Sequence, residues 1–120
     1  MITKDKERDF HMEALTWKTS LQETEGLLED IEKKIHRTNS IVADKTKERF
    51  ALSIKHYLEK IKNLKQRVSI FENRLSFLNE CDTSQCDLAF FEEADDISTL
   101  VKICTKNVKV LLSDSSYYST

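Results

Sequence analysis

The stretch FALSIKHYLEKIKNLKQRVSIFENRLSFL, residues 50–78, decides the fold of this chain. Its apolar side chains recur at alternating steps of four and three residues, with no polar interruption. The members of this series are Phe50, Ile54, Tyr57, Ile61, Leu64, Val68, Phe71, Leu75 and Leu78. Such steps place successive side chains on one stripe of an α-helix. The stretch therefore predicts a long amphipathic helix that packs along a narrow apolar seam.

Two further series with the same spacing lie on either side of this stretch. The earlier series consists of Phe10, Ala14, Trp17, Leu21, Thr24, Leu28, Ile31 and Ile35. The later series consists of Phe90, Ala94, Ile97, Val101, Cys104, Val108 and Leu111. Three stripes of this kind predict an all-α protein, a three-helix up-down-up bundle with two long, coiled-coil-like antiparallel helices and a shorter third helix.

Breaks in the heptad phase and clusters of capping residues predict where the helices end. The expected helices run from about Lys4 to Arg37, from about Ile41 or Asp44 to Asn79, and from near Asp87. The Thr-Asn-Ser sequence at residues 38–40 favours a tight hairpin, although one long helix with a stutter near Asn39 is left open. We expect a single helical-bundle domain over residues 1–112 and a flexible Ser- and Tyr-rich tail over residues 113–120.

Composition restricts the chain to helices and loops. Its 120 residues contain no proline and a single glycine, Gly26, so the usual turn residues of β-hairpins and phosphate-binding loops are missing. The sequence has no apolar run long enough to span a membrane and no signal-peptide pattern after Met1. Three cysteines, an odd number without a secretory pattern, favour reduced thiols. We therefore expect a cytoplasmic protein with no membrane association.

Charge is distributed unequally among the three predicted helical segments. Residues 1–40, 41–79 and 80–120 carry net charges of −2, +5 and −5. In an up-down-up bundle the acidic start of the third helix lies beside the basic second half of the second helix, and we favour this mutual neutralisation. The alternative is a nucleic-acid-binding bundle that uses the basic helix 41–79. Its phosphate contacts would come from Lys55, Lys60, Lys62, Lys65, Arg67 and Arg74.

The remaining polar residues form no clear pattern for catalysis or metal binding. The nearest approach to a metal-binding pair is Glu32 with His36, which falls beside the first stripe, and the three histidines lie at different levels of the predicted hairpin. Cys81 and Cys86 are separated by four residues with no second pair, so a zinc or redox role for them is left open but not favoured. Cys104 belongs to the third stripe and is expected in the core. We expect no catalytic residue, cofactor or metal, and a metal-dependent helical-bundle enzyme is the least favoured alternative.

Four apolar residues outside the stripes form the candidate interaction surface. With Ile54 at heptad position a, Ile70 and Phe77 fall at position c of the second helix, and Ile103 and Val110 fall at position c of the third. Each pair faces away from its own seam, where stacked apolar side chains are typical of partner docking or self-association. Scattered surface apolar residues, which are common, are the alternative interpretation. We expect a non-enzymatic module for protein–protein interaction or assembly, with a protein partner or a second copy of the chain bound.

Overall fold

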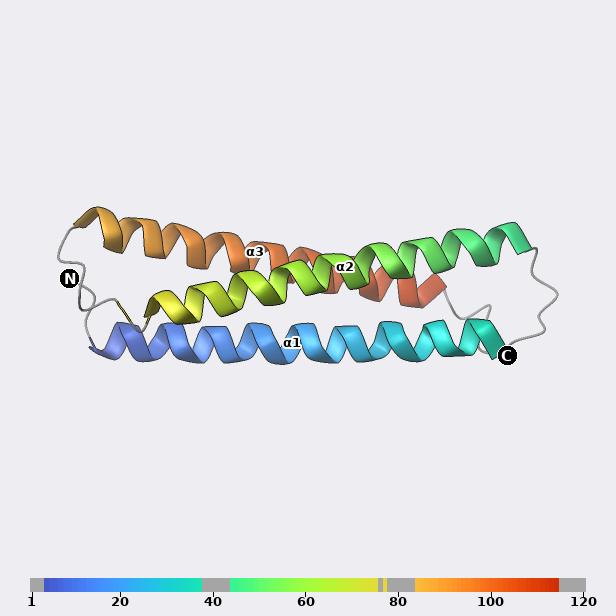
Figure 1. Cartoon of the computed structure of the whole chain (residues 1–120), viewed down its shortest axis with the longest axis horizontal. Coiled ribbons are helices and arrows are strands. Elements are labelled where there is room, and N and C mark those ends of the chain that lie inside the picture. The colour runs from blue at the N-terminus through green and yellow to red at the C-terminus, as the bar shows by residue number, and fades with distance from the viewer. Residues whose placement is uncertain (1–3, 38–43, 76, 78–83, 115–120) are drawn as a thin grey trace.

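The computed structural model describes residues 4–37, 44–75, 77 and 84–114, and within these ranges it consists of three α-helices. They are α1 (Lys4–Arg37, 34 residues), α2 (Asp44–Leu75, 32 residues) and α3 (Ser84–Asp114, 31 residues). The first and third helices run in one direction and the second in the other, and each packs against both others (Figure 1). The predicted all-α, up-down-up three-helix bundle is confirmed. The alternative prediction of one long helix through Asn39 is wrong, because α1 and α2 lie side by side in opposite directions.

The core of the bundle is made by the three predicted stripes. Among the described residues, every buried side chain belongs to one of these stripes. The stripe members Ile31, Tyr57 and Leu111 are partly buried against the core, and Leu78 lies outside the described residues. Removal of this apolar surface from water is the main favourable contribution to folding. The resulting molecule is a rod with extents of 62 × 19 × 18 Å.

A cluster of aromatic rings joins the three helices in the half of the bundle where α1 begins. Phe71 of α2 lies at its centre, with ring centroids 5.7 Å from Phe10 and 5.4 Å from Trp17 of α1. Phe90 of α3 completes the cluster, 5.4 Å from Phe10. Edge-to-face and tilted ring pairs add to the stability that burial alone provides. This cluster therefore ties all three helices together at one level.

Thr24 is the single buried polar residue among the described residues, with 7% of its surface exposed. Its hydroxyl donates a 2.7 Å hydrogen bond to the carbonyl oxygen of Ser20, one turn earlier in α1. A Thr hydroxyl bound in this way is satisfied inside its own helix. Thr24 therefore packs its methyl group in the seam and needs no polar partner on another helix.

Two predicted helix ends are wrong by a few residues. α2 ends at Leu75 instead of Asn79, and the N–H of Phe77 donates to the carbonyl oxygen of Arg74 at 3.0 Å, a tight turn that replaces the continuing α-helix. α3 begins at Ser84 instead of near Asp87. Its first residues do not belong to the apolar stripe, so periodicity could not report them. α3 also continues to Asp114, two residues into the predicted tail, and residues 115–120 and 38–40 lie outside the described residues.

Candidate interaction surface

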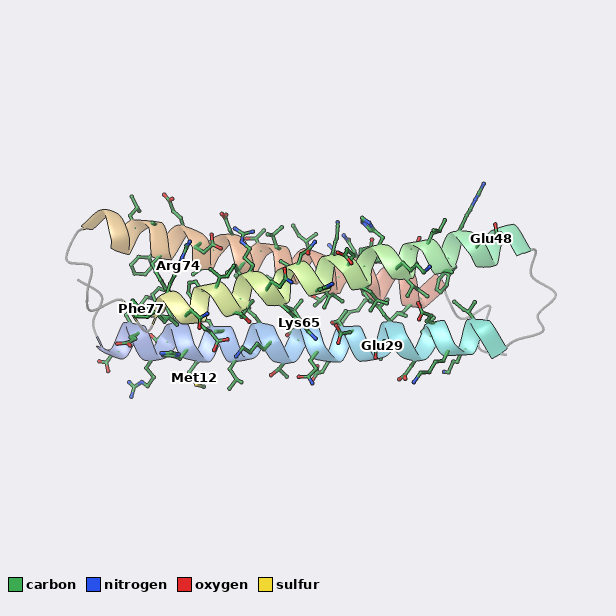
Figure 2. All side chains as sticks on the ribbon, in the orientation of Figure 1. Met12, Glu29, Glu48, Lys65, Arg74 and Phe77 are labelled. Carbon is green, nitrogen blue, oxygen red and sulfur yellow. The ribbon has the colours of Figure 1, made fainter. Side chains whose placement is uncertain are left out.

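The four residues of the predicted interaction surface are all exposed. Ile70 on α2 has 53% of its surface exposed, and Ile103 and Val110 on α3 have 49% and 58% exposed. Phe77 is 60% exposed, but it lies beyond the last residue of α2 and so does not continue the helical position of Ile70. Figure 2 shows Phe77 at the end of the bundle where α2 ends. All four side chains thus lie outside the seam, and three of them lie on helices.

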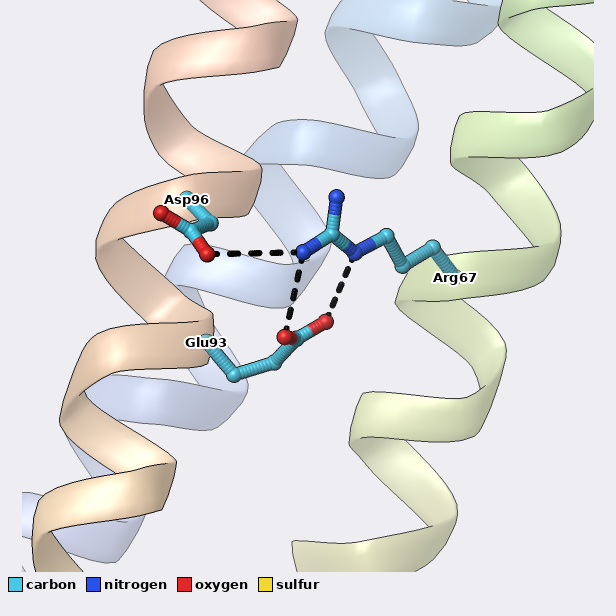
Figure 3. A network of polar contacts seen from close by, with 3 residues as sticks. All are labelled: Arg67, Glu93 and Asp96. Carbon is cyan, nitrogen blue, oxygen red and sulfur yellow. Dashed lines mark hydrogen bonds and ion pairs between the residues drawn. The ribbon is translucent and has the colours of Figure 1, made fainter.

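A charged network of Arg67 on α2 with Glu93 and Asp96 on α3 bridges these two helices (Figure 3). Arg67 donates two hydrogen bonds to Glu93, from Nε to Oε1 at 2.7 Å and from Nη2 to Oε2 at 3.1 Å. The same Nη2 lies 3.6 Å from Oδ2 of Asp96. This hydrogen bonding is the main cause that lowers the pKa of Glu93 and raises the pKa of Arg67, and burial acts against both shifts. The predicted neutralisation of basic α2 by the acidic start of α3 is confirmed at these residues.

The pairing of Arg67 with Glu93 also fixes which residues of the antiparallel helices lie at the same level. Ile70 lies three residues beyond Arg67 in α2, and Ile103 lies ten residues beyond Glu93 in α3, which runs the opposite way. At 1.5 Å per helical residue, these two side chains are about 20 Å apart along the bundle. The structure therefore does not bring the predicted residues together as one patch. Ile70 lies toward the end of the bundle where α2 ends, Ile103 lies near the level of Lys60 in the middle of α2, and Val110 lies beyond it.

Ile103 borders an open groove of about 270 Å³ between α2 and α3. The groove is lined by Lys60, Asn63, Leu64, Arg67, Leu100, Ile103, Cys104 and Asn107. Cys104 is 4% exposed, which confirms its predicted place in the core. Burial raises the pKa of the Cys104 thiol, and the charge of Lys60 acts weakly in the opposite direction. A buried thiol with a raised pKa is a poor nucleophile, so the groove offers apolar contact and not thiol chemistry.

Two of the cations considered for phosphate binding are partly exposed and pair with carboxylates of neighbouring helices. Lys65 donates a 2.9 Å hydrogen bond from Nζ to Oε1 of Glu25 on α1, and it lies between the two helices in Figure 2. Arg67 binds Glu93 as described above. The other four cations, Lys55, Lys60, Lys62 and Arg74, have exposed side chains. The basic face of α2 is thus partly neutralised by its neighbours.

The exposed side of α3 opposite its buried stripe carries Ile103 and Val110 together with residues that the sequence analysis did not assign to the candidate surface. We call this side the α3 outer face. It consists of Leu88, Ala89, Glu92, Asp95, Asp96, Thr99, Lys102, Ile103, Lys106, Lys109 and Val110, all of which are exposed. Carboxylates occupy its N-terminal half and lysines its C-terminal half. The signal that could have identified it is the helical phase of these charges, which recur opposite the buried stripe.

The histidines and cysteines form no metal site in the described part of the chain. His11 on α1 and His56 on α2 are both exposed. The side chains of His36, Cys81 and Cys86 lie outside the described residues. Within the described ranges, no group of three His, Cys, Asp or Glu side chains is placed to hold a metal ion.

The three helices pack around one common apolar core, and the surfaces of the bundle are their outer sides. None of the helices described here has a stretch long and apolar enough to cross a membrane. Comparisons of the chain with protein-family models, with curated proteins and with solved structures find no match.

Proposed function

We propose that the chain is a non-enzymatic protein-association module that binds its partner through the α3 outer face. The observation that carries this proposal is the distribution of exposed large apolar side chains. Five of those on the described residues belong to α3, against three on α1 and two on α2. Leu88, Ile103 and Val110 lie on the α3 outer face, whereas Phe91 contacts Phe10 of α1 and Leu100 lines the groove beside α2. Because the seam of α3 is already filled by its own stripe, Leu88, Ile103 and Val110 are not needed to close the bundle.

The chemistry of this face suits association with another protein. Ile103 and Val110 are separated by two helical turns, which is the spacing of apolar anchors in helix-mediated recognition. The charged residues around them match the polar rim that surrounds apolar anchors in protein interfaces. Both anchors lie on a helix that is fixed by a complete core. Binding of a partner to them therefore costs little conformational entropy. We place this activity in the cytoplasm, in keeping with the odd number of cysteines.

Nucleic-acid binding by residues 41–79 receives less support from the geometry. Phosphate binding needs several free cations on one surface. Lys65 and Arg67 instead form hydrogen bonds to Glu25 and Glu93 of the neighbouring helices. A charge already neutralised within the protein releases few counterions from nucleic acid, which weakens this second reading.

The proposal is tested by photo-crosslinking in the cells that express the protein. The crosslinking residue p-benzoylphenylalanine is introduced at Ile103, and in a matched control at Glu29, which is exposed on the outer side of α1 (Figure 2). We expect protein adducts from position 103 and none from position 29. The adduct should also disappear when Val110→Glu is added, because a charge at the second anchor disrupts the same contact.

Mass spectrometry of the adduct identifies the bound protein and the crosslinked position. Adducts that form equally from positions 103 and 29, or that persist in the Val110→Glu variant, would show that α3 has no specific contact. Absence of any adduct from position 103 would contradict the proposal.

A further inference from the structure

The charges of the α3 outer face are separated by sign along the helix. Glu92, Asp95 and Asp96 occupy its N-terminal half, and Lys102, Lys106 and Lys109 occupy its C-terminal half. Thr99, an exposed residue with a small side chain, lies between the two halves. An arrangement of this kind is complementary to itself when a second copy of the helix runs in the opposite direction.

Most of these charges are not neutralised within the described part of the bundle. Arg67 pairs with Glu93 and Asp96, but Glu92, Asp95, Lys102 and Lys106 form no ion pair with any of the residues that the structure describes. Two carboxylates and two lysines thus remain available on one face. Exposed groups of opposite sign that have no partner in their own molecule are suited to pair with another one.

We propose that the partner of the α3 outer face is a second copy of the chain, bound antiparallel about a two-fold axis at Thr99; this inference rests on the association function proposed above. In that register Glu92, seven residues before Thr99, lies opposite Lys106 of the second copy, seven residues after it. Asp95, four residues before Thr99, lies opposite Lys102, three residues after it. The two-fold axis repeats both pairs, because residue i contacts residue j and residue j contacts residue i.

Leu88 and Val110, two of the three large apolar residues of the face, fall at the ends of the same contact. Val110 of one copy lies level with Ala89 of the other, since they are eleven residues after and ten residues before Thr99. Leu88, which is 59% exposed, lies outside the charged pairs, and Ile103, which is 49% exposed, lies between Lys102 and Lys106. Apolar burial at the two ends supplies association energy, whereas the exposed ion pairs are individually weak and mainly select the register and direction.

Other arrangements of two copies put like charges together. A parallel contact of α3 with α3 places carboxylates beside carboxylates and lysines beside lysines. An antiparallel contact shifted to centre on Ile103 brings Lys102 close to the lysines of the second copy. Such juxtapositions disfavour the wrong complex. The antiparallel register at Thr99 places carboxylates of one copy opposite lysines of the other.

The outer faces of the other two helices lack this self-complementarity. The exposed outer residues of α1 do not separate by sign: Asp5, Arg8 and Asp9 lie at one end, and Glu29, Asp30 and Lys33 lie at the other. An antiparallel pair of α1 helices would therefore bring like and unlike charges together at each end. The exposed charges of α2 are mostly lysines and arginines, as described above. Among the helices described, α3 alone carries the pattern that a symmetric dimer requires.

The experiment is sedimentation of the full chain with charge-exchange variants over a wide range of concentrations. The wild type is expected to shift from 14.0 kDa toward twice that mass as concentration rises. Glu92→Lys alone and Lys106→Glu alone should each weaken dimerisation at least about tenfold, because each places two like-charged pairs in the contact. The double variant Glu92→Lys, Lys106→Glu should dimerise like the wild type, because the signs are exchanged but still complementary.

A mixture of the two single variants gives the sharpest readout. A Glu92→Lys chain has Lys at both positions and a Lys106→Glu chain has Glu at both, so the mixture should form heterodimers although neither variant dimerises well alone. Glu29→Lys on α1 makes the same charge change away from the contact and should leave dimerisation unaltered. Circular dichroism checks that every variant keeps the helical content of the wild type.

The outcomes separate this inference from the association function itself. A chain that stays monomeric, a dimer that ignores Lys106→Glu, or single variants that fail to combine would each overturn the antiparallel α3 contact. If the chain is monomeric but position 103 crosslinks to another protein, the inference about a second copy fails and the association function stands. Crosslinks from position 103 to a second copy of the chain, together with heterodimers in the mixture of the two single variants, support both the association function and the antiparallel dimer.

Discussion

The rings of Phe71 on α2 and Phe90 on α3 meet with their centroids 4.5 Å apart, the closest of the ring contacts around Phe71. Phe71 also contacts Phe10 and Trp17 of α1, so one side chain touches the aromatic residues of both neighbouring helices. It has 1% of its surface exposed. Phe71 is therefore the residue whose loss should most disturb the packing of all three helices at once.

Phe71→Ala should lower the free energy of unfolding by about 3–5 kcal/mol, because it removes buried apolar surface and leaves a cavity among three helices. Urea unfolding followed by circular dichroism measures the change. Phe71→Leu, which fills part of the space, should cost less and stays measurable if the alanine variant does not fold. Phe77→Ala is the matched control, since Phe77 is 60% exposed and its loss should change stability by no more than about 0.5 kcal/mol. Equal losses at both positions would mean that the cluster is not a centre of stability.

The core was predictable to this degree because a heptad repeat constrains a helix strongly. Once the steps of four and three were read, each stripe residue could face only the seam, and the buried residues of the described helices all lie there. Helix ends were less predictable, because Leu75 and Ser84 end and begin helices for local reasons that apolar periodicity does not contain. The exposure of the candidate surface residues could be predicted, but their positions relative to one another could not. Ile70 and Ile103 share a heptad position, yet their separation depends on how α2 and α3 are aligned.

The neighbours of each helix could have been read from the flanking charges. Lys65 pairs with Glu25 and Lys18 pairs with Glu72, all four at the heptad position that follows d, across the boundary of α1 and α2. Arg67 and Glu93, which lie at the position before a, pair across the boundary of α2 and α3. Opposite signs at matching flanking positions therefore specify which sides of the helices meet. The phase of the charges on the α3 outer face is the same kind of signal, applied to the solvent side.

The pKa of Glu93 predicts a pH-dependent contribution to stability. Because the folded-state pKa is lowered below its ordinary value of 4.5, the contribution is fully present above that value and is lost as pH falls through the lower folded value. At neutral pH the wild type should be more stable than Glu93→Gln by up to about 1 kcal/mol, since the pair is partly exposed. At low pH the two proteins should converge. Urea unfolding at both pH values tests this.

Glu29→Gln supplies the control for that titration, because Glu29 is exposed and forms no ion pair with the described residues. Its stability should follow that of the wild type at both pH values. If the difference in the free energy of unfolding between wild type and Glu93→Gln stays constant as pH falls, the charge of the Glu93 carboxylate does not contribute to stability.

Gly26 offers a substitution that should stabilise the protein. It lies inside α1, and a Cβ atom added there would have no heavy atom within 4 Å. Gly26→Ala should therefore raise the free energy of unfolding by about 0.5–1 kcal/mol, because alanine has the higher helix propensity and loses less backbone entropy on folding. Thermal and urea unfolding measure the gain. If stability does not rise, or falls, the outer side of α1 needs the glycine for a contact with another molecule.

The thiol of Cys104 should react only when the bundle opens. It is 4% exposed, and burial raises its pKa, so both access and thiolate content are reduced. In a Cys81→Ser, Cys86→Ser background, its reaction with a thiol reagent near pH 8 should be at least about tenfold slower in the folded than in the urea-unfolded protein. A folded-state rate equal to that of the unfolded chain would contradict the burial of Cys104.

The odd number of helices has a mechanical consequence. α1 begins at Lys4 at one end of the rod, and α3 finishes at Asp114 after running in the same direction toward the other end (Figure 1). A bundle with an even number of antiparallel helices returns the chain to the side from which it started. Here, a cargo joined ahead of α1 and another joined behind α3 would be held about 45 Å apart by a rigid spacer, the length of some 30 helical residues.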